Sequence, residues 1–211
     1  MGARVTIIGC GPGGVDLMTI RAKSAIEEAD LIVGSRRLLD GLAHGKDVTA
    51  LVLEDNYGNI FEEVERVGKD KKVAFLVSGD PLFYSFGESA IKKFGRENCE
   101  VIPGVSSFQY AFCLLKESWK DYRIYSLHGA KDADIEGIFE GNKRFILLLD
   151  MEHNLKYIKA RVLPEVGGRF IFRVASNLSM PGEDISEISY DGFGSFPEES
   201  LSLLIARRDD G

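Results

Sequence analysis

Short apolar runs alternate with helical segments through the first half of the chain, and this alternation constrains the fold more than any other feature. Runs typical of buried strands occur at 5–8, 31–33, 73–77 and 100–102. Apolar residues at helical spacing occupy 17–29, 60–67 and 82–94, and a further helix is expected from Ser106 or Ser107 to about Leu115. Strands that alternate with helices predict an α/β fold with a mostly parallel sheet.

The second half of the chain has a different pattern. Runs typical of strands lie at 124–127, 145–149, 170–174, 185–190 and 201–206, with helices near Ile135 and Leu155. The last strands follow one another without helices, so we expect antiparallel strands and a mixed second sheet. The polar segment around Trp119, at 116–121, is the expected connection. We therefore predict two domains, at residues 1–115 and 116–211.

Charge and cysteine content limit the classes of partner. The 26 Lys and Arg residues against 33 Asp and Glu give a formal net charge of −7, which disfavours broad binding to nucleic acid. Cys10, Cys99 and Cys113 are odd in number and lack CxxC spacing, so we predict no disulfide framework and no metal site. With no signal-peptide pattern and no long apolar stretch, we expect a cytoplasmic protein without a membrane segment.

Gly9-Cys10-Gly11-Pro12-Gly13-Gly14 follows the first strand and formally matches the dinucleotide-binding pattern G-x-G-x-x-G. Three features oppose that interpretation. Pro12 has no N–H to offer a pyrophosphate. The second strand ends in Gly34-Ser35-Arg36, with no acidic residue for a ribose hydroxyl. The following helix also begins late, after Val15-Asp16.

Two more loops rich in glycine and proline follow predicted strands. Ser78-Gly79-Asp80-Pro81 comes after the strand at 73–77, and Pro103-Gly104-Val105-Ser106-Ser107 after the strand at 100–102. Ligands of open parallel sheets bind outside the carboxyl ends of the strands. We therefore expect the three loops to form one crevice.

In order and spacing, the three loop motifs resemble those of the tetrapyrrole (corrin and porphyrin) methylases. The resemblance extends to 175–183, which is similar to a late N-L-G-x-x-x-E segment of that family. It implies a two-domain tetrapyrrole methylase fold with S-adenosylmethionine in a cleft between the domains, a homodimer, and an S-adenosylmethionine-dependent methyltransferase activity. The implied cofactor-binding residues are Gly11, Pro12, Gly13, Gly79, Asp80, Phe83, Ser106, Ser107, Leu149, Met151, Ala175 and Asn177.

Two positions depart from the family pattern. The first loop of the family commonly reads G-P-G-D, whereas this chain has Gly14 there and its acid at Asp16. Ser179 replaces a frequent glycine of the late segment, for which we expect a different turn conformation.

Within the family, Trp119 and Asp121 followed by Ser126-Leu127-His128-Gly129 resemble the group that methylates carbon 5 of cobalt-precorrin-7 in cobalamin biosynthesis. The resemblance is to the free-standing form of that group, so a separate protein is expected to supply the decarboxylating C(15)-methyltransferase activity. Asp80 and His128 are the catalytic candidates. Arg36, Arg37 and His128 are the candidates for binding the corrinoid substrate.

Three alternatives remain open at this stage. In the first, the methyl acceptor is another precorrin carbon, uroporphyrinogen, a modified histidine of a protein, or ribosomal RNA. In the second, the chain is an NAD-linked oxidoreductase. In the third, it binds the cofactor without catalysis and serves as an assembly partner. Methyl transfer to carbon is an in-line displacement that depends on alignment of two ligands, so no metal or covalent nucleophile is expected.

Overall fold

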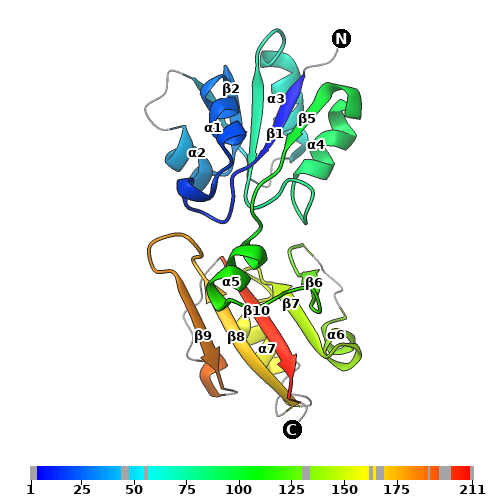
Figure 1. Ribbon diagram of the computed structural model, residues 1–211. Helices are drawn as coiled ribbons and strands as arrows, with labels where there is room; N and C mark the ends of the chain where they lie inside the picture. The colour runs from blue at the N-terminus through cyan, green and yellow to red at the C-terminus, as the bar shows by residue number, and fades with distance from the viewer. Residues whose placement is uncertain are drawn as a thin grey trace. The chain divides into compact units, whose positions relative to one another are not determined.

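The computed structural model describes residues 4–43, 48–54, 57–129, 134–161, 164, 169–189, 191–194 and 201–209. Two compact units, Met1–Ser107 and Phe108–Gly211, make up the chain (Figure 1). The division falls at the start of helix α5 (Ser107–Leu115), whereas the domain boundary expected from the sequence lies after that helix. Edge-on ring contacts join α5 to the second unit, at 5.2 Å between the centroids of Phe108 and Trp119 and 4.8 Å between those of Phe112 and Tyr122.

The first unit is built on a five-stranded parallel sheet with the order β3-β2-β4-β1-β5, as the alternation of strands and helices predicts. Its strands are β1 (Val5–Gly9), β2 (Leu31–Gly34), β3 (Thr49–Val52), β4 (Val73–Val77) and β5 (Cys99–Ile102). Its helices are α1 (Ile20–Glu27), α2 (Arg36–Leu42), α3 (Tyr57–Val67) and α4 (Gly87–Phe94), with short 3-10 turns at η1 (Val15–Leu17) and η2 (Arg96–Asn98). The sequence did not predict β3, an edge strand whose first two residues are exposed, or the short helix α2.

Helices cover both faces of this sheet because the central strands are apolar on both sides. Ile8 and Leu76 face a core cluster shared with α1 and α2, whereas Ile7 and Phe75 face a second cluster shared with α3 and α4. All four side chains are at most 1% exposed. Each such side chain contributes roughly 1.5–3 kcal/mol through burial, so the sheet is a firm base for the loops that leave it.

Two helices of the first unit begin later than predicted, and both delays leave loop at the carboxyl ends of the strands. Helix α1 begins at Ile20 because Thr19 caps it, its Oγ1 accepting from the Ala22 N–H at 3.1 Å. Helix α4 begins at Gly87, since residues 82–86 form turns in which Tyr84 has a φ of 47°. The helices predicted at 17–29 and 82–94 are therefore too long at their starts.

The second unit contains a mixed sheet with the order β6-β7-β10-β8-β9, which confirms the predicted architecture. Its strands are β6 (Arg123–Ser126), β7 (Arg144–Leu148), β8 (Phe170–Ser176), β9 (Asp184–Ile188) and β10 (Ser202–Arg208); its helices besides α5 are α6 (Ile135–Gly141) and α7 (Leu155–Arg161), with a 3-10 turn at η4 (Asp191–Gly194). β6 and β7 are parallel, and the other pairs are antiparallel. β9 and β10 each pair with β8, which lies between them, so the two last strands do not pair with each other.

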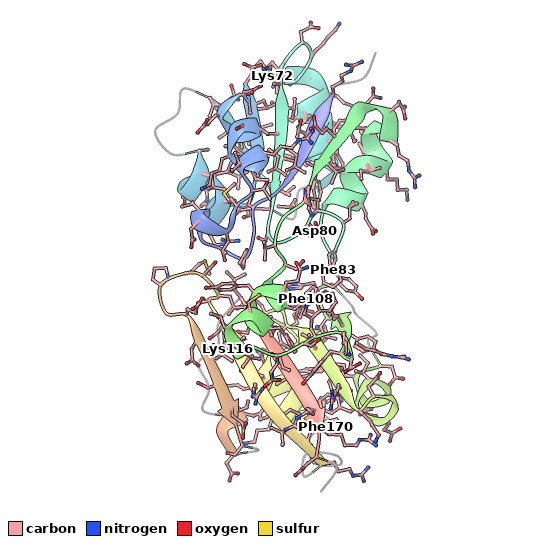
Figure 2. All side chains as sticks on the ribbon, viewed as in Figure 1. Lys72, Asp80, Phe83, Phe108, Lys116 and Phe170 are labelled. Carbon is pink, nitrogen blue, oxygen red and sulfur yellow. The ribbon has the colours of Figure 1, made fainter. Side chains whose placement is uncertain are left out.

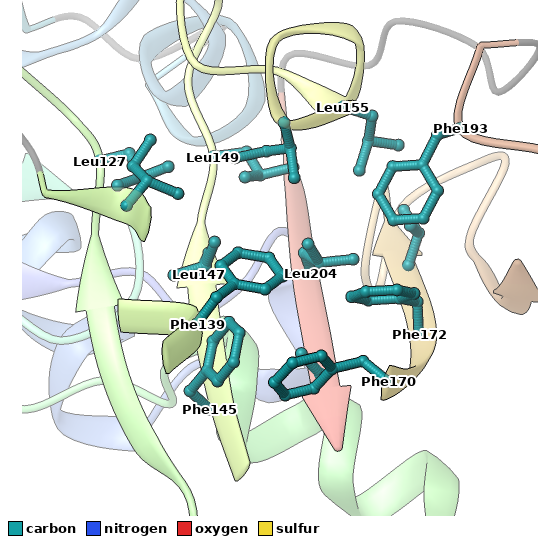
Figure 3. Close-up of a cluster of buried hydrophobic side chains, with 14 residues drawn as sticks. Leu127, Phe139, Phe145, Leu147, Leu149, Leu155, Phe170, Phe172, Phe193 and Leu204 are labelled. Atoms are coloured by element: carbon teal, nitrogen blue, oxygen red, sulfur yellow. The ribbon is translucent and has the colours of Figure 1, made fainter. Parts of the chain in front are cut away.

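The core of the second unit is rich in phenylalanine (Figure 3). Phe139 meets Phe145 edge-on at 4.7 Å and Phe170 at 5.5 Å. Leu147 and Leu204, on the adjacent strands β7 and β10, are fully buried beside them. The parallel pairing of β6 with β7 brings Ser126 opposite Leu148, so the loops that follow these two strands start side by side.

Candidate functional site

Three loops leave the carboxyl ends of β1, β4 and β5, which are neighbours in the parallel sheet of the first unit. Asp80 and Phe83 lie at that end of the sheet, whereas Lys72 marks the opposite end of β4 (Figure 2). The three motifs singled out in the sequence are therefore brought together. The expected crevice residues within this unit, from Gly11 to Ser106, share one edge of one sheet.

The loops meet backbone to backbone. The Gly79 N–H donates to the Gly11 carbonyl at 2.9 Å, and the Gly11 N–H donates to the Gly79 carbonyl at 3.4 Å. A Cβ on Gly104 would lie 2.2 Å from the Gly79 oxygen, and a Cβ on Gly9 would lie 2.5 Å from the Gly104 nitrogen. Gly11 and Gly79 also have positive φ angles of 75° and 65°. Gly9 and Gly104 leave no space for a side chain between the strand ends, whereas Gly11 and Gly79 need glycine because of their positive φ angles.

Asp80 organises two of the three loops. Its Oδ1 accepts from the Leu82 N–H at 2.9 Å, and its Oδ2 accepts from the Gly104 N–H at 3.4 Å. The first bond is an Asx turn within the β4 loop, and the second reaches the loop after β5. Because both carboxylate oxygens accept hydrogen bonds from backbone N–H groups, Asp80 is placed to fix the shape of the loops. A catalytic role for Asp80 stays a prediction.

The two arginines at the start of α2 have different surroundings. Arg37 donates to the Ser78 hydroxyl at 2.7 Å, which ties α2 to the β4 loop, and burial lowers the pKa of its guanidinium. Arg36 is exposed and lies 3.9 Å from Glu54. Of these two arginines, Arg37 alone is joined to the three loops by a hydrogen bond described in the structure.

Cys10, in the first loop, is buried, and its Sγ lies 3.6 Å from the Ile8 carbonyl. Burial raises the pKa of its thiol to about 12. A neutral thiol is a poor nucleophile, so Cys10 is not suited to a covalent role.

The start of α1 bears on the dinucleotide alternative. A 3-10 turn at Val15–Leu17 separates Gly14 from the helix, which begins at Ile20. A dinucleotide fingerprint needs the helix N-terminus directly against the glycines, where its N–H groups and dipole meet the pyrophosphate. The glycine segment therefore lacks the helix that an NAD-linked enzyme would use.

Apolar side chains border the same loops on the exposed side. Val15, Leu82 and Tyr84 are 54%, 50% and 55% exposed. Ser106 is 5% exposed, and Phe83 is half-buried with its ring 4.9 Å from that of Tyr84. The loops thus offer backbone polar groups and uncharged surface together.

In the second unit, β6 and β7 are parallel neighbours, so their carboxyl ends also adjoin. His128 follows β6, and Leu149 and Met151 follow β7. Leu149 is 3% exposed and Met151 is 68% exposed. His128 lies at the surface, where partial burial of its ring lowers the pKa and the charge of Asp150 opposes that shift.

Sequence inspection did not single out Asp150. Its Oδ1 accepts from the N–H groups of Glu152 and His153 at 2.9 and 2.6 Å, and its Oδ2 accepts from the Gly129 N–H at 3.3 Å. Burial alone would raise the pKa of this carboxyl, but the hydrogen bonds from the His153 backbone and ring and from Gly129 lower it. An acidic residue just beyond a strand end, with Glu152, His153 and Asn154 close behind it, is the Asx-turn signal that marks it.

The late segment turns sharply after β8. Ala175 is fully buried within the sheet, paired with both Leu203 and Ile185, so its side chain offers no accessible surface. Asn177 and Ser179 have φ angles of 48° and 58°. Ser179 therefore keeps the left-handed backbone that glycine favours, while the Glu183 carboxylate accepts from its N–H at 2.6 Å.

Two further findings concern the described residues as a set. They contain no group of three or more His, Cys, Asp or Glu side chains that could hold a metal ion. None of the helices described is both long enough and apolar enough to cross a membrane.

Comparison with known proteins gives consistent matches. The family model described as Tetrapyrrole (Corrin/Porphyrin) Methylases matches residues 4–189. The probable cobalt-precorrin-7 C(5)-methyltransferase of Methanocaldococcus jannaschii is 36% identical over 61% of this chain, a match that spans 62% of that relative's length. The cobalt-precorrin-7 C(5)-methyltransferase of Salmonella typhimurium is 29% identical over 97% of this chain and 100% of its own.

A solved structure supports the same fold. The uroporphyrin-III C-methyltransferase of Thermus thermophilus, complexed with S-adenosyl homocysteine, aligns with a TM-score of 0.78 at 19% identity, over 97% of each chain. Both the two-unit α/β architecture and the extent of the family match agree with the resemblance seen in the loop motifs. The chain belongs to the tetrapyrrole (corrin/porphyrin) methylases, and it is an S-adenosylmethionine-dependent methyltransferase.

Proposed function

We propose that this enzyme transfers a methyl group from S-adenosylmethionine to carbon 5 of cobalt-precorrin-7, or of the metal-free precorrin, in cobalamin biosynthesis. The observation that carries the choice of acceptor is the similarity along 97% of the chain to a relative that is named for this reaction. Trp119, Asp121 and the segment Ser126 to Gly129 support the same acceptor group.

The strand-end loops of the first unit fit a large, mostly uncharged ligand. Val15, Leu82 and Tyr84 expose uncharged side chains beside these loops, and the Asp80 carboxylate is held by the backbone N–H groups of Leu82 and Gly104. We assign the cofactor to Gly11, Pro12, Gly13, Gly79, Asp80, Phe83, Ser106 and Ser107 in this unit, and to Leu149, Met151, Ala175 and Asn177 in the second. Bound there, the cofactor supplies a sulfonium methyl group as the electrophile.

The protein's own groups then act by alignment and by moving one proton. When the carbon nucleophile gains a methyl group, its C–H bond must release a proton to restore conjugation. His128 is our candidate acceptor, because partial burial lowers its pKa and so keeps the imidazole neutral near neutral pH. Arg36 and Arg37 are candidates for the carboxylates of the macrocycle.

Assembly and location belong to the same proposal. We propose a cytoplasmic homodimer, which works alongside a separate decarboxylating C(15)-methyltransferase. The net charge of −7 is compatible with a small-molecule acceptor and disfavours ribosomal RNA.

Purified enzyme, cobalt-precorrin-7 and methyl-labelled S-adenosylmethionine test the acceptor directly. One labelled methyl group on the macrocycle, located at carbon 5 by NMR, is the expected result. Label on a different tetrapyrrole and none on cobalt-precorrin-7 would refute the acceptor. Calorimetric binding of S-adenosylhomocysteine without turnover of any tetrapyrrole would instead favour a non-catalytic assembly partner.

A further inference from the structure

One carboxylate in the second unit joins two loops that come from different strands. Asp150 follows β7, and its Oδ2 accepts from the N–H of Gly129, which follows β6 and is adjacent to His128. Its Oδ1 accepts from Glu152 and His153, in its own loop. The two loops are therefore tied at a single side chain.

Contacts with His153 hold the Asp150 carboxylate in place. The side chain of His153 is 10% exposed, and its Nδ1 lies 3.2 Å from Asp150 Oδ1. That ring packs edge-on against Tyr157 at 5.0 Å, so helix α7 fixes its position. Asp150 is itself largely buried, with 16% of its side chain exposed. A largely buried carboxylate that accepts several hydrogen bonds has little freedom to move.

The first unit also contains a carboxylate that joins two loops. There Asp80 binds its own loop through Leu82 and reaches Gly104 in the loop after the next strand. In both units, a carboxylate two or three residues beyond the end of one strand bonds to the loop that follows a strand parallel to it. Asp80 lies in a motif shared with the family, whereas Asp150 belongs to none of the motifs that carry the resemblance.

We propose that Asp150 is a positioning residue for methyl transfer, which holds the loop of His128 and the loop of Met151 in one mutual arrangement. The inference rests on the proposed function only in placing His128 and Met151 at the bound ligands. Asp150 itself touches neither ligand in this proposal. It acts through the N–H of Gly129 and through the turn at Glu152 and His153.

Two variants separate the inter-loop bond from the local turn. Asp150→Ser keeps a short acceptor for the turn but no longer reaches Gly129. Asp150→Asn keeps the size of the side chain, but its amide NH2 group replaces one carboxylate oxygen. That NH2 group then faces either the Gly129 N–H or the N–H groups of Glu152 and His153, and a hydrogen bond is lost. Asp134→Asn is the matched control, because Asp134 caps α6 by accepting from the Gly137 N–H at 2.9 Å, and asparagine caps equally well.

The measurements are calorimetry with S-adenosylhomocysteine, hydrogen exchange of the Gly129 amide by NMR, and kcat and KM with cobalt-precorrin-7. For both Asp150 variants we expect faster exchange at Gly129 and about tenfold weaker S-adenosylhomocysteine binding, the equivalent of one lost charge-assisted hydrogen bond. We expect kcat to fall about 10- to 100-fold through misalignment, with a smaller change in KM. Asp134→Asn should match the wild type in all of these.

Lower melting temperatures with unchanged S-adenosylhomocysteine affinity and unchanged kcat would show that Asp150 only stabilises the fold, and the proposal would be wrong. Unchanged exchange at Gly129 in Asp150→Ser would also overturn it. Failure of the wild type to methylate cobalt-precorrin-7 would refute the proposed acceptor instead, and the affinity and exchange data would still decide the role of Asp150.

Discussion

Replacement of Gly104 by alanine tests whether the three strand-end loops meet as tightly as the structure shows. The added Cβ would lie 2.2 Å from the Gly79 oxygen and 2.7 Å from the Gly9 carbonyl carbon, both backbone atoms that no rotamer change can move. An ordinary contact is longer by about 1 Å or more. The β4 loop must therefore shift away from β1 and β5.

That shift has a cost that can be worked from the contacts. It would break the pair of hydrogen bonds between Gly11 and Gly79, worth about 1 kcal/mol each. Overpacking adds about 1–3 kcal/mol. We expect Gly104→Ala to lose about 3–5 kcal/mol of unfolding free energy, a large part of the stability of a typical domain.

Urea unfolding followed by circular dichroism measures this loss, and calorimetry with S-adenosylhomocysteine reports on the loops. Gly41→Ala, within helix α2 of the same unit, is the control, because a Cβ there meets nothing within 4 Å. The control should gain up to about 1 kcal/mol through reduced freedom of the unfolded chain. If Gly104→Ala unfolds at the same urea concentration as the wild type and binds the ligand equally, the backbone junction is refuted.

Three further outcomes are expected. Ser179→Gly should raise the free energy of unfolding by about 0.5–1 kcal/mol, and with it the melting temperature, because Ser179 has a φ of 58° that glycine adopts without strain. A lower melting temperature would contradict this. In a thiol-reagent titration at pH 8, exposed Cys113 should react quickly and Cys10 only after unfolding, because burial raises the Cys10 pKa to about 12; early labelling of Cys10 would count against its burial. The Asp150 pKa is lowered in the folded state, so its stabilisation is complete above the unfolded pKa and is lost as pH falls through the folded value. Acid unfolding of the wild type should therefore be steeper than that of Asp150→Asn, and identical profiles would exclude this contribution.

The parallel sheet of the first unit, the mixed sheet of the second and the three strand-end motifs can all be predicted from the amino-acid sequence. Apolar runs such as 73–77 are buried on both faces, and glycine and proline mark where they end, so periodicity is sufficient to predict them. Strand β3 was missed because it lies at the sheet edge with Thr49 and Ala50 exposed, where burial imposes no pattern.

How the loops contact one another depends on the folded arrangement of the strands. The sequence predicts that the three loops lie at one end of the sheet, but the direct backbone approach of Gly9, Gly79 and Gly104 follows only from the folded structure. The same holds for the bond from Gly129 to Asp150, since an Asx turn can be predicted from neighbouring residues, whereas a partner across two strands cannot. Local patterns specify the elements, but the order of strands in each sheet selects which loops become neighbours.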